Sequence, residues 1–214
     1  MAAPGIKGTV FSAIVEHVRA LRDAGKIDPS LLEHRLGAKG VEVLEQKILP
    51  MNWYPIEVYG RLRDLLCEIE GGGKDEYTVA AAAESARRLK AGGLYQQLNY
   101  LERWQAHATT GDAAADAEAR RNLFRSQLVL VSTIYAGLFN FGTTKIDPDP
   151  EFPDRFQLEY WDAGLMPRAG RLAVLGFWSE MSLSWVTRKD EPLFYKTDHA
   201  DHYVIRMRRD VARM

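Results

Sequence analysis

The segment AGRLAVLGFWSEMSLSWV, residues 169–186, decides the fold class. It is apolar on nearly every side, and Arg171 and Glu180 are its only charged residues, so it predicts a helix buried between two layers. Just before it, FQLEYW (156–161) alternates in the period of a half-buried strand. After it, PLFYKT (192–197) and HYVIRMRR (202–209) predict a hairpin joined by residues 198–201.

The chain before this region predicts helices. Asp28 caps a helix that has Pro29 at its first position, where a missing N–H costs nothing, and Thr9 is the expected cap of the first helix. The expected helices cover residues 9–25, 29–37, 38–50, 55–70, 78–93, 94–107 and 116–138. We therefore expect one α+β domain over 1–214, with a mainly helical half (1–138) packed on a small antiparallel sheet formed by 139–214.

Composition narrows the classes of function. The 28 basic and 29 acidic residues give a net charge of −1, so no bulk field attracts nucleic acid or anionic lipid. A single cysteine, Cys67, excludes an internal disulfide and a multi-cysteine zinc site, which favours a cytoplasmic location. The longest uncharged run, residues 126–144, contains several polar residues, so we expect a core helix and no membrane span. No signal peptide is expected at the start.

The stretch KTDHADHYVIRM, residues 196–207, is the strongest candidate for chemistry, because it carries two histidines and two aspartates. Alternation along a strand places Tyr203, Ile205 and Met207 inward. It places His202, Val204, Arg206 and Arg208 outward on the solvated face. A metal site needs converging ligands, so a polar hairpin turn is the preferred interpretation. A metal or catalytic site in the turn, using the residues Asp198, His199, Asp201 and His202, remains the alternative.

Three isolated residues have a structural and a chemical interpretation each. Cys67 is a small residue at a helix edge, or a reactive thiol beside a cation. His107 ends a helix, where its charge would favour the helix dipole, or it binds a haem or a metal. Glu180 lies at a helix edge that reaches solvent, or it is an acid with a raised pKa. The structural interpretation is preferred for all three.

Aromatic residues supply the only candidate binding site. An apolar pocket for a small ligand would be lined by Trp53, Tyr54, Phe139, Phe141, Phe177 and Trp178. A place in the hydrophobic core explains most of these side chains equally well. No glycine-rich phosphate loop, Ser/His/Asp arrangement or HExxH motif is present, so no catalytic residue, metal ligand or cofactor is predicted.

The run from AGRLAVLGFW to DHADHYVIRM (169–207) resembles the end of 4-vinyl reductase domains and of TRAPP core subunits. RLGAKGVEVLEQKIL (35–49) and the helix after Pro55 are similar to the helical half of the same nitric-oxide-signalling and Golgi-transport ligand-binding fold. IKGTVFSAIVEHVRAL with WYPIEVYGRLRDLL resembles more closely a myxobacterial paralogue family of about this length. The resemblance implies helices against a four-stranded antiparallel sheet, often dimeric, that binds apolar ligands or partner proteins.

The sequence departs from these families at their functional motifs. Where many 4-vinyl reductase domains carry two cysteines around the last hairpin, this chain has Lys196 and Val204. The Tyr-x-Ser-x-Arg motif of the haem-binding branch is missing, and so is the acylated cysteine of TRAPP subunits, whose region here is LPMNWY (49–54). We therefore expect a non-enzymatic binding module: a dimeric cytoplasmic sensor or scaffold, as a homodimer or with a partner protein, that holds an apolar small molecule. A metalloprotein or enzyme using the Asp198–His202 turn, or a haem sensor, is the alternative.

Overall fold

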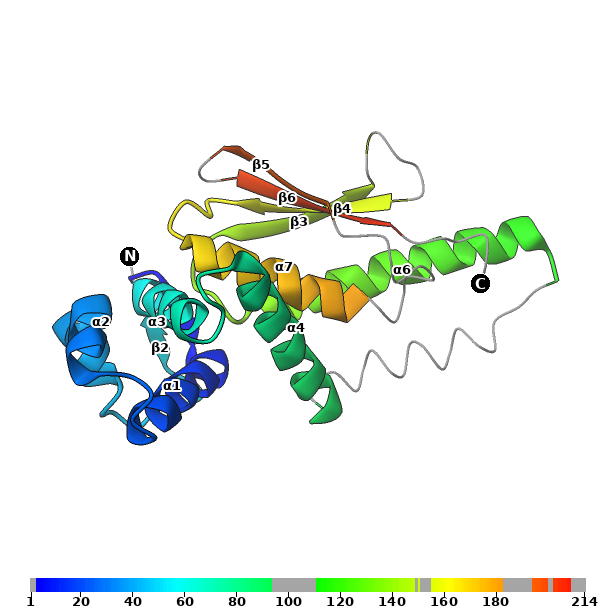
Figure 1. Ribbon diagram of the computed structural model, residues 1–214. Coiled ribbons are helices and arrows are strands. Elements are labelled where there is room, and N and C mark those ends of the chain that lie inside the picture. The colour runs from blue at the N-terminus through cyan, green and yellow to red at the C-terminus, as the bar shows by residue number, and fades with distance from the viewer. Residues whose placement is uncertain are drawn as a thin grey trace.

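The structure is a computed structural model, which describes residues 3–93, 111–148, 150, 155–182, 194–199 and 202–208. Figure 1 shows an α+β arrangement, as the sequence predicted, in which a group of N-terminal helices lies beside a small sheet and two further helices run under that sheet. The predicted helix over 94–107, and His107 with it, lies outside the described residues. Within the part described, no helix is long and apolar enough to cross a membrane.

The helical elements follow the predicted order. They are α1 (Gly8–Asp23), α2 (Pro29–Val43), α3 (Ile56–Ile69), α4 (Asp75–Ala91), α6 (Ala113–Ala136) and α7 (Arg168–Ser182). Asp28 caps α2 as predicted, because its side chain accepts a hydrogen bond from the backbone N–H of Ser30 at 2.7 Å. Gly37, with a φ of 66°, breaks α2 in two, where the sequence predicted two short helices.

Two helix boundaries differ from prediction. The first helix begins at Gly8 with Lys7 in the cap position, so Thr9 is already helical and the prediction that it caps the helix is wrong. The second half of α2 ends at Val43 and not at Pro50, because the chain turns there toward a short strand. That strand, β2 (Trp53–Pro55), pairs antiparallel with β1 (Gly5–Lys7), and the sequence predicted neither.

The main sheet has four antiparallel strands in the order β3-β4-β6-β5. They are β3 (Thr143–Pro148), β4 (Arg155–Trp161), β5 (Phe194–His199) and β6 (His202–Arg208). The last three match the predicted strands, and four strands are what the family resemblance implied. The sequence missed β3 because Pro148 and Pro150 indicate a loop; β3 is an edge strand that ends at Pro148, where a proline removes no ladder hydrogen bond from the sheet interior.

Helix α7 lies between the sheet and α4, as its apolar composition predicted (Figure 1). Toward the sheet, the indole N–H of the fully buried Trp178 donates a hydrogen bond to the hydroxyl of Tyr160 on β4. Toward the helices, the backbone of Gly176 packs on α4, and a Cβ at this position would lie 2.0 Å from the carbonyl oxygen of Val79. The tight crossing fixes the relative position of α4 and the sheet.

The end of α6 ties the two halves of the chain together. The side chain of Asn140 accepts a hydrogen bond from the N–H of Gly5 at 2.6 Å and donates one to the carbonyl of Ala3 at 2.9 Å. The N–H of Lys7 donates to the carbonyl of Leu138 at 2.9 Å. These bonds hold the start of α1 against the residues that follow α6, and the candidate site lies at this junction.

Candidate functional site

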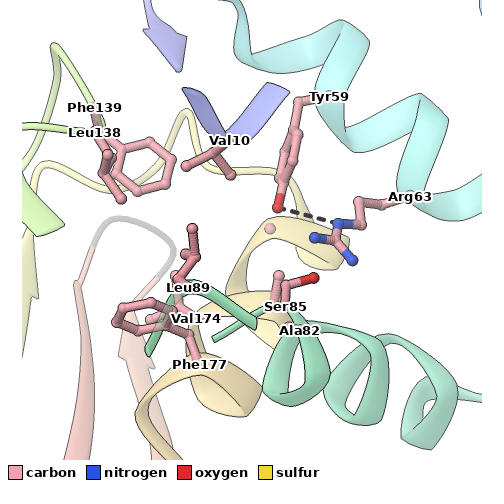
Figure 2. A pocket seen from close by; sticks show the side chains of 12 residues that line it. Val10, Tyr59, Arg63, Ala82, Ser85, Leu89, Leu138, Phe139, Val174 and Phe177 are labelled. Carbon is pink, nitrogen blue, oxygen red and sulfur yellow. Dashed lines mark hydrogen bonds between the residues drawn. The ribbon is translucent and has the colours of Figure 1, made fainter. Parts of the chain in front are cut away.

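A small apolar pocket lies where α1, α3, α4 and α7 meet the end of α6 (Figure 2). Its volume is about 50 Å³, which leaves room for one or two water-sized groups. Two of the aromatic residues named from the sequence, Phe139 and Phe177, contribute to its wall. The lining consists of Val10, Tyr59, Arg63, Ala82, Ser85, Leu89, Leu138, Phe139, Gly170, Ala173, Val174 and Phe177.

A larger open cleft adjoins this cavity between α1, α3 and α4. Its volume is about 410 Å³, and Val10, Arg63, Ser85 and Leu89 line both spaces. The remaining lining residues are Thr9, Ala13, Ile14, His17, Leu66, Tyr77, Ala81, Glu84 and Arg88. The floor is therefore mainly aliphatic, while the polar groups come from the helix faces around it, an arrangement typical of small-molecule sites.

Arg63 is the charged residue at the junction of the two spaces. Its Nε donates a hydrogen bond to the hydroxyl of Tyr59 at 3.1 Å, and its guanidinium carbon lies 5.2 Å from the centre of that ring. Tyr59, Arg63 and Leu66 fall on one side of α3 because positions four and seven apart share a helix face. The sequence offered this signal, a charge within an apolar stripe, but Arg63 was not among the predicted site residues.

Three hydrogen-bonded polar side chains lie at one end of the cleft, near the end of α3. The hydroxyl of Tyr77 on α4 donates a hydrogen bond to one carboxylate oxygen of Glu70, and His17 on α1 lies 3.1 Å from the other. Burial and the bond to Glu70 raise the pKa of Tyr77 to about 12. Burial by itself would raise the pKa of Glu70, but the bonds from Tyr77 and His17 outweigh it and lower that pKa. These hydrogen bonds thus connect α1, α4 and the C-terminal end of α3.

The other aromatic residues named from the sequence lie outside the cavity lining. Tyr54 stacks on Phe11 with ring centres 4.8 Å apart, and its hydroxyl accepts a bond from the N–H of Leu49. Phe141 packs edge-on against Phe139. Trp178 is enclosed by the sheet, as described above. Trp53 is 42% exposed, with the ammonium of Lys7 3.9 Å above its ring.

The preferred interpretation of Glu180 is wrong. Its carboxylate is buried, with 8% of the residue exposed, and it accepts a hydrogen bond from Arg87 on α4 at 2.8 Å. The carboxylate therefore pairs across the α4–α7 contact instead of reaching solvent. Cys67 is also buried, and its thiol donates to the carbonyl of Lys74 at 3.1 Å, in keeping with the structural interpretation.

The predicted solvated positions of His202 and Val204 are also wrong, because Val204 is only 6% exposed and His202 is covered as well. Strand parity is correct, since Ile205 is fully buried opposite Leu158, but His202 is only 9% exposed. Its ring stacks on Trp161, with centres 3.8 Å apart, and its Nε2 lies 3.2 Å from a carboxylate oxygen of Glu159. Neighbouring side chains on the outer face cover the histidine, a contact between strands that parity cannot reveal.

The hairpin turn is described only in part. Asp198 and His199 belong to β5, where His199 pairs with His202 through the backbone, whereas Ala200 and Asp201 lie outside the described residues. Among the residues that the structure places, no group of three or more histidine, cysteine, aspartate or glutamate side chains could hold a metal ion.

Comparisons with known proteins show that the fold of this chain is similar to that of solved structures. No protein-family model and no curated protein matches the chain. Among solved structures, an Fe(II) unliganded mutant H-NOX protein from K. algicida is similar, with a TM-score of 0.50 and 12% identity over 96% of this chain and 97% of that one. A Cs H-NOX mutant carrying 4-cyano-L-phenylalanine has a TM-score of 0.46 and 14% identity, over 96% and 97%.

A mutant of T. tengcongensis H-NOX has a TM-score of 0.44 and 13% identity, over 96% of this chain and 98% of that chain. At such identities the comparison supports the fold alone. The first of these structures agrees with the α+β fold, and it does not single out the 4-vinyl reductase or TRAPP branch named from the sequence.

Proposed function

We propose that the chain is a non-enzymatic sensor or scaffold that binds a small, largely apolar molecule in the cleft between α1, α3 and α4. The observation that carries the proposal is the cleft itself, whose 410 Å³ falls within the roughly 300–1,000 Å³ of small-molecule sites. The fold likeness supports the same role, since one similar structure is an H-NOX protein in an unliganded form.

The polar groups of the cleft favour binding over catalysis. His17 and Tyr77 are both bonded to Glu70, and Glu84 is bonded to Arg88 at 3.1 Å. General acid–base or nucleophilic chemistry needs a nucleophile within hydrogen-bond reach of a base, both facing the substrate space. Instead, Glu70 holds His17 on α1 and Tyr77 on α4, while Glu84 and Arg88 pair within α4, so these contacts stabilise the walls of the cleft.

A haem sensor is the second candidate, because the resembling fold has a haem-binding branch and one neighbour contains Fe(II). The residues present do not fit a haem: the sequence lacks the Tyr-x-Ser-x-Arg motif of the haem-binding branch, and His17, the histidine of the described cleft lining, is bonded to Glu70 at 3.1 Å. We therefore assign no iron chemistry to the described residues. A Soret absorption band in the purified protein would reverse this assignment.

We further propose that the module works in the cytoplasm as a homodimer or bound to a partner protein. The single cysteine and the resemblance to 4-vinyl reductase domains and TRAPP subunits support this part of the proposal. Light scattering coupled to size-exclusion chromatography tests it, because a strictly monomeric protein at all concentrations would contradict the homodimer.

Decanol, a neutral apolar probe, tests the binding site directly. Ala13 lies on the cleft wall and is exposed, so Ala13→Trp should fill the cleft without disturbing the core. Ala20→Trp is the matched control, because Ala20 is exposed on the same helix and is not part of the lining. We expect decanol to stabilise the wild type and the control against heat, and Ala13→Trp to lose that effect. Equal responses in the two variants, or none in the wild type, would contradict the proposed site.

A further inference from the structure

We propose that the cleft selects an amphipathic carboxylate, whose carboxylate group binds Arg63 while its apolar chain lies along the aliphatic floor. This inference rests on the proposed binding function and adds the chemical class of the ligand. Three features of the structure support it: Arg63 has no carboxylate partner, it lies between the two spaces, and Glu84 and Arg88, the other charged residues of the described lining, are paired with each other.

Arg63 differs from most arginines around it in having no carboxylate partner. Ion pairs with aspartate or glutamate are formed by Arg22, Arg35, Arg61, Arg87, Arg88 and Arg168. Arg63 is partly buried, and within the described part of the chain its hydrogen bond to Tyr59 leaves both terminal nitrogens of the guanidinium without an acceptor. A partly desolvated guanidinium is stabilised by an anion, and its planar fork matches the two oxygens of a carboxylate.

The position of Arg63 suits a ligand with one charged end. Figure 2 shows its terminal nitrogens directed toward the space between α3 and α4, on the side of Ser85, while the opposite walls carry Val10, Phe139 and Val174. The Ser85 hydroxyl donates to the carbonyl of Ala81, so its oxygen remains able to accept a bond but has no proton to offer an anion. Recognition of the charge therefore falls to Arg63.

The acidic side chains nearest the cleft already have hydrogen-bond partners of their own. Glu84 contacts both Arg87 and Arg88, and Glu70 accepts hydrogen bonds from Tyr77 and His17. Neither carboxylate lies within ion-pair distance of Arg63. Arg63 is therefore the charged residue of the described lining that has no ion-pair partner. This favours an anionic ligand over a cationic or neutral one.

Binding of decanoate to the full-length chain, measured by isothermal titration calorimetry beside decanol, tests the inference. We expect decanoate to bind the wild type at least tenfold more tightly than decanol. Arg63→Met should weaken decanoate binding roughly 10- to 100-fold and leave decanol unchanged, because a hydrogen-bonded charge is lost while the apolar floor remains. Arg61→Met is the matched control: Arg61 lies on the same helix, is paired with Glu57 and lines neither space, so decanoate should bind this variant within about threefold of the wild type.

Arg63→Lys provides a second variant should the methionine variant fold poorly. It keeps the positive charge but loses the two-pronged geometry, so an intermediate affinity for decanoate supports the inference. Equal affinity of the wild type for decanoate and decanol would overturn the role of Arg63 while leaving the proposed cleft intact. Binding of neither probe would overturn the proposed function together with the inference.

Discussion

Gly176 on α7 and Val79 on α4 are in such close contact that a Cβ on the glycine would lie 2.0 Å from the valine carbonyl oxygen and 3.0 Å from the Cβ of Ala82. The two helices therefore pack backbone to backbone at this point, and α7 can lie flat between α4 and the sheet. Because the obstruction is backbone and not a flexible side chain, a larger residue forces the helices apart.

Gly176→Ala should lower the free energy of unfolding by about 1–3 kcal/mol, the usual cost of overpacking. Gly170→Ala on the same helix is the control, because its new methyl would crowd the flexible side chain of Met166 and meet Pro167 only at ordinary contact distance, while alanine favours the helix. Urea denaturation followed by circular dichroism compares the two variants. If both alanines changed stability equally, the close helix crossing would be contradicted.

Stability should decline at alkaline pH through Tyr77. Its pKa is about 12 in the folded chain, against about 10 when unfolded, so between these pH values the unfolded state binds fewer protons than the folded state. The stabilising contribution is complete below pH 10 and is lost as the pH rises toward 12. Between pH 9 and pH 11 the free energy of unfolding, measured by denaturation, should fall more in the wild type than in Tyr77→Phe. The other titratable groups are the same in both proteins. Parallel losses in the two proteins would contradict the raised pKa of Tyr77, which burial and the bond to Glu70 produce.

Arg87→Met should lower the melting temperature, because it leaves the carboxylate of Glu180 buried without its donor. Adding Glu180→Gln to that variant should recover much of the loss, since no buried charge is then left unpaired. Arg88→Met is the control, because Arg88 is a largely exposed neighbour that contacts the more exposed Glu84. If Arg87→Met were as stable as Arg88→Met, the buried carboxylate of Glu180 would not need its hydrogen bond from Arg87.

His202→Ala should destabilise the sheet by about 1–3 kcal/mol, through the lost stacking on Trp161 and the lost partner of Glu159. His202→Phe keeps an aromatic ring against Trp161 and should cost less. His34→Ala, at an exposed histidine on α2, should change stability by no more than about 0.5 kcal/mol. Thermal denaturation of the three variants ranks their losses of stability. Equal losses for the alanine variants at positions 34 and 202 would contradict the buried contact between His202 and Glu159.

The candidate site was predictable only in part. Phe139 and Phe177 were named from the surplus of aromatic residues, and both line the small apolar pocket. Trp53 and Trp178 were named for the same reason but lie at the surface and within the core, because composition does not say which apolar side chain borders a void. Arg63 was missed because a cation on a helix usually faces solvent, and its position between two spaces depends on α1 and α4.

The sequence by itself determined the order of helices and strands and the burial of α7, because periodicity and local composition act over a few neighbouring residues. It predicted that Ile205 faces the helices, since side chains alternate along any strand. Only the tertiary structure decided the polar partners. Glu180 pairs with a residue 93 positions away and His202 with one 43 positions away, while Arg63 has no carboxylate partner. Such pairings depend on how elements distant in the sequence pack against each other, and the spacing of neighbouring residues does not predict that packing.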